Sequence, residues 1–280
     1  TMGKPLSEID DGLTLLYLLG RPDLELIGVT TTFGNGPLDD VLHCTRRLLA
    51  ELGREDIPVL RGAASAGDSD TEAAAFLAET VAARPGEVDV LATGPLGNVA
   101  AAARRDPGFY ANVRQLGCMG GYLRQPLRIG WRDLGELNLS ADAAASHDVL
   151  TAGAAATEVA LFSAHICLQA PFGHRELSEL RRRTRWSAKR INTVRFWRWT
   201  FGLHCGVPHF YLWDLLPAVW LELPELFCGG EVSVTSTVED LSTGAVKVAP
   251  PEAGARVSLP TAIGDVDGFY EALFGAWERV

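Results

Sequence analysis

Short runs of β-branched and aliphatic residues alternate along this chain with longer segments whose apolar residues recur at helical spacing. Short apolar runs indicate strands, and repeats near 3.6 residues indicate amphipathic helices. The pattern predicts strands at residues 24–32, 57–60, 88–92, 113–118 and 158–162. It predicts helices at residues 13–20, 37–52, 71–83, 96–105 and 141–150. This alternation indicates βαβ units and a mainly parallel sheet.

The last part of the chain has a different pattern. A long helical region rich in Arg and Trp is followed by two short strand-like runs, 231–237 and 245–248, which predict a β-hairpin. No repeat, linker or low-complexity tract interrupts the pattern. We therefore expect an α/β fold of one domain, residues 1–280, in which helices flank a mainly parallel, Rossmann-like open sheet that ends in a C-terminal β-hairpin.

The beginning of the chain has loop character but leads directly into the buried-looking helix 13–20. In α/β proteins a loop of this kind usually follows a strand. We therefore expect that a first strand belongs upstream of the printed residues.

Composition limits the class of protein. The chain has 280 residues, of which 47% are hydrophobic and 21% charged, with a formal net charge of −10. A chain of this length can bury a large core, and its acidic balance argues against a nucleic-acid partner. The five cysteines are scattered and lack C-x-x-C spacing, which is typical of reduced thiols in a cytoplasmic protein. Neither a charged-then-apolar leader nor an apolar run long enough to span a bilayer is present.

The most informative polar feature is the acid pair Asp10–Asp11, which directly precedes the apolar helix. Acids in a first helical turn face the positive end of the helix dipole, which favours their ionised form. Two fixed negative charges on a short loop suit a hard cation or sugar hydroxyls. Taken alone, the pair is explained equally well by simple N-capping.

Further polar residues follow the predicted strands. Ligands of open parallel sheets gather at the carboxyl ends of the strands, so these loops are the candidates for a site. They contain Asn35, Thr93, Met119, Glu136, Asn138 and Asp214.

In this order, the segments resemble the nucleoside hydrolase family, the inosine–uridine type of N-ribohydrolases. The first motif of that family, D-x-D-P-G-x-D-D, is matched only in its last part, at residues 9–11. The other family-like stretches are residues 29–35, 56–59, 92–96, 119–121 and 136–138. The resemblance runs from about residue 8 to residue 228 and is weak beyond, and six short motifs in register carry it.

The resemblance implies hydrolysis of the N-glycosidic bond of ribonucleosides, with Asp10, Asp11 and Asp214 as catalytic residues. It implies a calcium ion held by Asp11, the backbone carbonyl of Thr93 and Asp214. The ribose 2′- and 3′-hydroxyls would be bound by the metal, Asp10 and Asn35. Glu136 and Asn138 would bind the 5′-hydroxyl side of the ribose, and Met119 would pack beneath the sugar. The family also implies a homodimer or homotetramer.

The pair Trp213–Asp214 resembles the purine-specific branch of the family, in which an indole stacks on the base. Plain core packing is the alternative interpretation of Trp213. Purine-specific relatives place a second aromatic residue in the loop that corresponds to residues 61–70, and this loop contains none. A second stacking partner could come from Phe196, Trp197, Trp199 or Tyr211, although core or dimer contacts are the favoured interpretation of these four residues. His204 and His209 could line the base pocket, although partial burial is their ordinary interpretation. The substrate is therefore expected to be an unusual purine-like nucleoside.

The general-base position of the family corresponds to Leu6, and Glu8 is expected to lie on the wrong part of the loop to replace it. The missing acid belongs to an upstream segment or is lost. The first alternative function is therefore a catalytically impaired member that binds a nucleoside. The second is a nucleotide- or nucleic-acid-binding protein that uses the Arg-rich segment 175–198, although such a segment is more often a solvated helix face.

Overall fold

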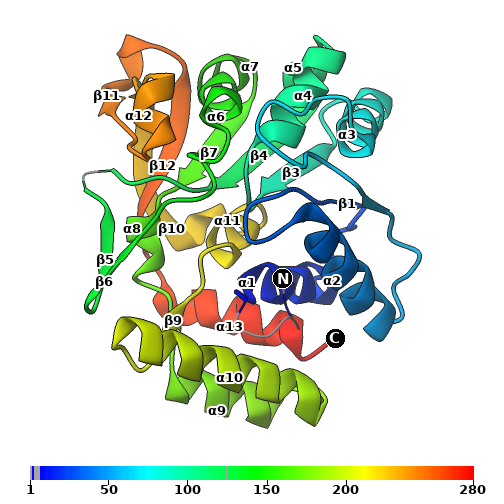
Figure 1. The fold of residues 1–280 in the computed structure, drawn as a ribbon, viewed down its shortest axis with the longest axis vertical. Coiled ribbons are helices and arrows are strands. Elements are labelled where there is room, and N and C mark those ends of the chain that lie inside the picture. Colours follow the sequence, from blue (N-terminus) through cyan, green and yellow to red (C-terminus); the bar gives the residue numbers. More distant parts are fainter. Residues whose placement is uncertain (1, 3–6, 124) are drawn as a thin grey trace.

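The computed structural model describes residue 2, residues 7–123 and residues 125–280. Within these residues the largest sheet has six strands in the order β11-β10-β12-β7-β4-β3 (Figure 1). The strands β3 (Val88–Ala92), β4 (Val113–Met119), β7 (Glu158–Phe162) and β12 (Arg256–Ile263) are parallel neighbours. The strands β10 (Phe227–Val234) and β11 (Val248–Ala249) are antiparallel additions to this sheet. The expected mainly parallel sheet with a C-terminal hairpin is confirmed.

Two strands form a separate small sheet. Strand β1 (Val29–Thr30) pairs in parallel with β2 (Val59–Leu60). The predicted strand 24–32 was therefore too long. The residues before Val29 have no strand partner among the described residues, and a ladder extends only where a neighbour supplies hydrogen-bonding groups.

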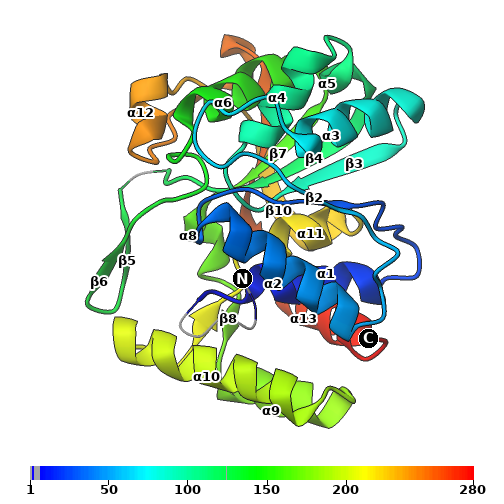
Figure 2. The same ribbon diagram turned by 45° about the vertical axis from the view of Figure 1, so that its right-hand side comes forward.

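Helices cover both faces of the six-stranded sheet (Figures 1 and 2). One face carries α3 (Glu72–Ala83), α4 (Gly97–Arg105), α5 (Phe109–Asn112), α6 (Ala143–Asp148), α7 (Ala154–Ala156) and α12 (Val238–Ser242). The other carries α1 (Asp10–Gly20), α2 (Leu38–Glu51), α11 (Leu215–Trp220) and α13 (Val266–Trp277). Two clusters of buried apolar side chains fill the spaces between the helices and the sheet.

Several helix boundaries follow from local capping chemistry. The side chain of Thr71 accepts a hydrogen bond at the start of α3, and that of Asp142 does so at the start of α6. Helix α6 continues as a π-helical turn, Val149–Gly153, so the predicted helix 141–150 is confirmed with a different geometry at its end. Helix α1 has no side-chain cap, and of the two acids in its first turn Asp10 is buried and Asp11 is half-buried.

The long Arg- and Trp-rich region forms two helices, α9 (His174–Arg183) and α10 (Ala188–Cys205). Helix α10 begins with the capping side chain of Ser187 and ends at Gly206, whose φ of 78° is easily adopted only by glycine. Helix α9 packs on α13 and on α10, so the pair lies outside α13 (Figure 1).

The sequence pattern did not predict every element. The additional elements are α5, α7, α8 (Ala164–Cys167), α12, the hairpin of β5 (Leu127–Ile129) and β6 (Arg132–Leu134), the pair β8 (Pro171–Phe172) and β9 (Phe210–Tyr211), and β12 and α13. Three-residue turns of 3-10 helix occur at Pro224–Leu226 and Pro251–Ala253. Among the described residues, none of the helices combines the length and apolarity that a bilayer crossing demands.

One buried polar side chain ties the loops after β1 and β2 to α4. The amide of Asn98 is 5% exposed, donates to the Thr31 carbonyl at 3.0 Å and accepts from the Ala63 N–H at 2.9 Å. Both backbone groups lie where strands end, at the edge of the sheet where a ligand is expected. Asn98 therefore fixes the loops that approach the candidate site.

Candidate active site

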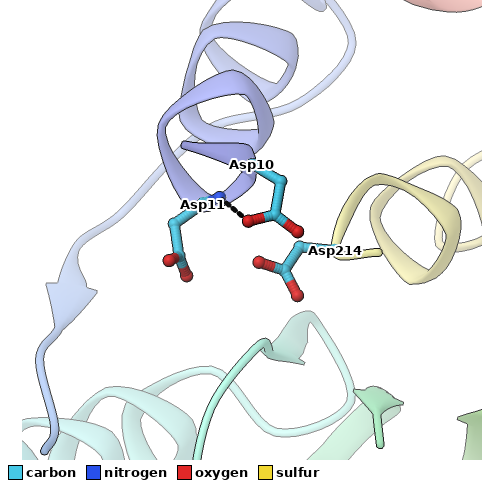
Figure 3. Close-up of side chains that lie close together, drawn as sticks. All are labelled: Asp10, Asp11 and Asp214. Atoms are coloured by element: carbon cyan, nitrogen blue, oxygen red, sulfur yellow. Dashed lines mark hydrogen bonds between the residues drawn. The ribbon is translucent and has the colours of Figure 1, made fainter. Parts of the chain in front are cut away.

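Three carboxylates from the two halves of the chain meet at one point. Asp10 and Asp11 come from the first turn of α1, and Asp214 comes from the residue that precedes α11 (Figure 3). One carboxylate oxygen of each lies within 4.8 Å of the others. Asp10 and Asp214 are 1% and 3% exposed, so two of the three acids are buried. This arrangement could hold a metal ion, because clustered carboxylate oxygens are the ligands of hard cations.

The two loops named in the sequence analysis hold Asp11 from both sides. The Asn35 amide donates to one oxygen of the Asp11 carboxylate at 3.2 Å, and the Thr93 hydroxyl donates to the other at 3.1 Å. The Asp11 N–H donates to the Asp10 carboxylate at 3.2 Å. The loops after β1 and β3 and the first turn of α1 therefore converge on one carboxylate.

Burial and mutual repulsion make it unfavourable for the carboxyl groups of this cluster to be ionised together without a cation. Burial raises the pKa of Asp10 well above its usual range, and the charges of Glu8 and Asp11 raise it further. Burial also raises the pKa of Asp214, with added repulsion from Asp10 and Asp11. Of the Asp10 carboxylate, Oδ2 is buried and has no hydrogen-bond partner. A cation would satisfy this oxygen and remove the repulsion that raises both pKa values.

Two of the three acids, Asp10 and Asp214, line a cavity of about 290 Å³. Its walls bring together every predicted site residue except Asp11, from six different segments of the chain. They include Asp10, Asn35, Thr93, Met119, Glu136, Asn138, Trp213 and Asp214. A volume of this size is at the lower end of the range for small-molecule sites.

The wall opposite Asn35 is held in place by its own hydrogen bonds. The Glu136 carboxylate accepts backbone N–H bonds from Gly121 at 3.1 Å, Leu139 at 2.9 Å and Ser140 at 2.7 Å. The Asn138 amide donates to the Met119 carbonyl at 3.0 Å. Oε1 accepts two of these bonds and Oε2 accepts one, so Oε2 retains a lone pair for a ligand, because each carboxylate oxygen accepts two bonds.

The other end of the cavity is aromatic. Trp213, which is 8% exposed, lines it together with Trp197, Phe201 and His204. Trp197 and Phe201 come from α10, and their ring centroids lie 6.0 Å apart. Trp197 packs against the hydrophobic core, as the favoured interpretation expected, and it also lines the cavity, as the alternative of a second stacking partner requires. Its spacing from Phe201, one helical turn later, was the available signal.

The hairpin of β5 and β6 closes this aromatic end from the side. Leu127 and Leu134 of the hairpin line the cavity. At the hairpin tip the Trp131 indole N–H and the Arg132 Nε–H both donate to the His204 carbonyl, at 3.0 and 3.3 Å. Hairpin and helix α10 therefore meet at one carbonyl group.

The region of the missing general base is only partly described. Leu6, which corresponds to the general-base position of the resembled family, lies outside the described residues. Glu8 lines the cavity, contrary to the expectation that it lies on the wrong part of the loop. Burial raises the pKa of Glu8 to about 7, Asp11 adds to this increase, and a hydrogen bond from Trp213 opposes it. A carboxyl group thus lies between the acid cluster and the indole.

Other candidates lie elsewhere. His209 is hydrogen-bonded to the Tyr211 hydroxyl at 2.9 Å and is not among the residues that line the cavity.

Several cations of the Arg-rich segment have acidic or aromatic partners. Arg183 binds Glu271 and Glu278, Lys189 binds Glu51, and Arg190 lies over the Trp186 ring. This pairing weakens the interpretation of the segment as a nucleic-acid surface.

Comparison with known proteins identifies the family. The family model for inosine-uridine preferring nucleoside hydrolase matches residues 6–271, which is nearly the whole chain. The chain belongs to the nucleoside hydrolase family. Members of this family are enzymes that act on N-glycosyl compounds.

Curated relatives and solved structures agree with this assignment. The nucleoside hydrolase is 28% identical to probable uridine nucleosidase 1 of Oryza sativa subsp. japonica, over 84% of this chain and 80% of that protein. It is 30% identical to uridine nucleosidase 1 of Arabidopsis thaliana, over 78% and 72% of the two chains.

Its fold is similar to a plant nucleoside hydrolase, with a TM-score of 0.85, 21% identity and coverage of 98% and 97%. It is also similar to a purine-preferring ribonucleoside hydrolase from Gardnerella vaginalis, with a TM-score of 0.84, 20% identity and coverage of 97% and 96%.

Proposed function

We propose that this nucleoside hydrolase cleaves the N-glycosidic bond of purine-like ribonucleosides and uses a bound calcium ion. The observation that carries the proposal is one cavity of about 290 Å³ that is lined both by members of the acid cluster, Asp10 and Asp214, and by the aromatic side chains of Trp197, Phe201 and Trp213. A sugar suits the acidic end because its hydroxyls bind carboxylates and metals. A planar base suits the aromatic end because ring faces stack.

The acid cluster fits a hard cation. Its donor atoms are all oxygens, one of which is buried without a partner, and burial and like charges raise the pKa of Asp10 and Asp214. Asp11, Asp214 and the Thr93 carbonyl are the proposed ligands. Calcium takes oxygen ligands and, when bound, would orient the ribose hydroxyls and lower the pKa of water.

The protein side chains would position the sugar. Asp10 and Asn35 are proposed to bind the 2′- and 3′-hydroxyls, and Glu136 and Asn138 the 5′-hydroxyl. Met119 packs beneath the ring. As the C1′–N bond breaks, positive charge grows on the sugar, and the carboxylates at its lower face stabilise that charge. The attacking water supplies the oxygen that becomes the new C1′ hydroxyl.

The aromatic end is proposed to hold the base. Trp213 offers one face, and Trp197 and Phe201 offer a second aromatic surface that loop 61–70 does not supply. Two indoles favour the larger π-surface of a purine, and stacking favours protonation of the departing base. A uridine nucleosidase is the second candidate, because four of the curated relatives are named as uridine nucleosidases or probable uridine nucleosidases.

An assay of free-base release distinguishes a purine-like substrate from uridine. We expect kcat/KM for inosine and adenosine to exceed that for uridine, with activity lost after EDTA treatment and restored by calcium. Trp197→Ala is expected to raise KM for inosine about tenfold, which is the loss of about 1.4 kcal/mol of stacking. Trp199→Ala is the matched control, since the Trp199 side chain is 55% exposed and does not line the cavity.

Other outcomes have definite meanings. A preference for uridine, with Trp197→Ala and Trp199→Ala indistinguishable, would refute the assignment of the base. Nucleoside binding by calorimetry without any base release would identify the chain as an impaired, binding member of the family.

A further inference from the structure

Helix α10 lines the active-site cavity with three side chains, those of Trp197, Phe201 and His204. The two aromatic rings offer faces on which a base can stack, and Leu127 and Leu134 of the β5–β6 hairpin add apolar surface beside them. His204 brings the ring nitrogens of an imidazole to this wall. A polar group on a largely apolar wall is what orients a small ligand and selects it.

The β5–β6 hairpin is fixed against the end of α10 on which His204 lies. The Trp131 backbone N–H donates to the Cys205 carbonyl at 3.3 Å. At Gly130, which has a φ of 55°, an added Cβ would lie 1.9 Å from the same carbonyl oxygen, so only glycine permits this close approach. The contact brings the next residue of the hairpin, Arg132, to a fixed place beside His204.

Arg132 determines which ring nitrogen of His204 can donate a hydrogen bond. Its Nε–H donates to the His204 carbonyl at 3.3 Å, and its Nη2 lies 3.3 Å from His204 Nδ1. A guanidinium group has donors but no acceptor, so Nδ1 accepts this bond and carries no hydrogen. The hydrogen of the neutral imidazole is then on Nε2. In the part of the chain that the structure describes, Nε2 has no hydrogen-bond partner.

We propose that His204 donates a hydrogen bond from Nε2 to an acceptor atom of the bound base, and that Arg132 is the positioning residue that keeps this hydrogen on Nε2. The inference rests on the proposed function, because it requires a base at the aromatic end of the cavity. It assigns the selection of the base to two residues, one on α10 and one on the hairpin.

A donor at this place adds a kind of selection that stacking does not provide. Ring faces accept any base of similar size, whereas an N–H group at the edge of the base selects a ring nitrogen or a carbonyl oxygen and disfavours a C–H group. In inosine the acceptors remote from the ribose are N7 and O6. The substrate class is therefore a purine nucleoside that presents one of these two acceptors to His204.

The first experiment determines the tautomer of His204 without a ligand. Heteronuclear NMR of nitrogen-labelled histidine shows which nitrogen of a neutral ring carries the hydrogen, and loss of a signal in His204→Leu identifies the residue. We expect the hydrogen on Nε2 in the parent and a mixture of tautomers in Arg132→Met. Arg128→Ala is the matched control and should leave the tautomer unchanged, because Arg128 lies on the same hairpin, is 67% exposed and pairs with Asp133.

The second experiment removes the acceptors of the base one at a time. Calorimetry with calcium compares inosine with 7-deazainosine, which lacks N7, and with purine riboside, which lacks O6. The chain carries Asp10→Asn so that the nucleosides are not consumed. We expect one analogue to bind roughly three- to tenfold more weakly than inosine, the value of one hydrogen bond. His204→Leu should abolish this difference, and His204→Gln, which keeps an N–H donor, should retain part of it.

The outcomes separate this inference from the proposed reaction. Hydrogen on Nδ1 in the parent, or the same tautomer in Arg132→Met as in the parent, overturns the role of Arg132. Base release from inosine by the unaltered chain, with analogue differences that are equal in the parent and in His204→Leu, overturns the bond to the base and leaves the reaction standing. Analogue differences that depend on His204, without any base release, support the bond and overturn the reaction.

Discussion

Replacement of Asp214 by Asn tests the metal site through stability and not through turnover. Asp214 is buried beside Asp10 and Asp11, and burial with like charge raises its pKa. Asparagine keeps the shape but removes one negative charge and one ligand oxygen. We expect two opposite effects: the metal-free variant should be more stable than the parent, and calcium should no longer stabilise it.

The magnitudes follow from linkage. Calcium that binds only the folded protein, at a free concentration 100 times Kd, adds about 2.7 kcal/mol to the free energy of unfolding. A chain of 280 residues unfolds with an entropy of roughly 0.6 kcal/mol/K, so the midpoint should rise by about 4–5 °C. In the metal-free parent, at a pH above the raised pKa of Asp214, each unit of that increase lowers the free energy of unfolding by about 1.4 kcal/mol. This loss lowers the unfolding midpoint by about 2 °C.

The assay is thermal unfolding with EDTA or calcium at pH 5 and pH 8. The folded protein keeps protons on Asp10 and Asp214 that the unfolded chain has released, so metal-free stability should fall as pH rises from about 4 through the raised pKa values. Calcium must displace these protons, and its effect should therefore be larger at pH 8. An equal calcium shift in Asp214→Asn and the parent would refute the site.

Two further substitutions test the packing that supports the site. Asn98→Ala should lower the free energy of unfolding by roughly 2–5 kcal/mol, because two buried backbone groups lose their hydrogen-bond partner. Thermal unfolding of the variant and the parent measures this loss. Gly20→Ala should cost about 1–3 kcal/mol, because the added Cβ would lie 2.0 Å from the Ala276 carbonyl oxygen. In denaturant titrations its matched control is Gly275→Ala, which meets nothing within 4 Å and should be neutral or stabilising; equal losses in both would contradict the packing argument.

The fold was predictable where a local pattern and a long-range partner agree. Strand β3 was predicted at its observed bounds, 88–92, because its short apolar run coincides with a pairing partner, β4, along its whole length. The strand predicted at 24–32 is only Val29–Thr30 in the structure, since pairing depends on neighbours that a local pattern does not contain. Helix α13 was missed although it is strongly apolar, because no motif marks it.

The site was predictable as a set of loops but not as a cavity. Loops that follow parallel strands must meet at one edge, which is why Asp11, Asn35 and Thr93 are hydrogen-bonded in the structure. The roles assigned to them remain predictions. The aromatic wall from α10 could not be placed, because nothing in the chain shows how a helix distant in sequence packs over a strand end.

The shared His204 carbonyl has a kinetic consequence. Trp131 and Arg132 of the β5–β6 hairpin both donate to it, so two walls of the cavity are fastened together at the terminus of α10. The Trp131 backbone N–H adds a third bond, to the Cys205 carbonyl, at 3.3 Å. An opening that separates the hairpin from α10 must break these bonds together, so we expect that weakening them would speed release of a cleaved base without changing the bond-breaking step.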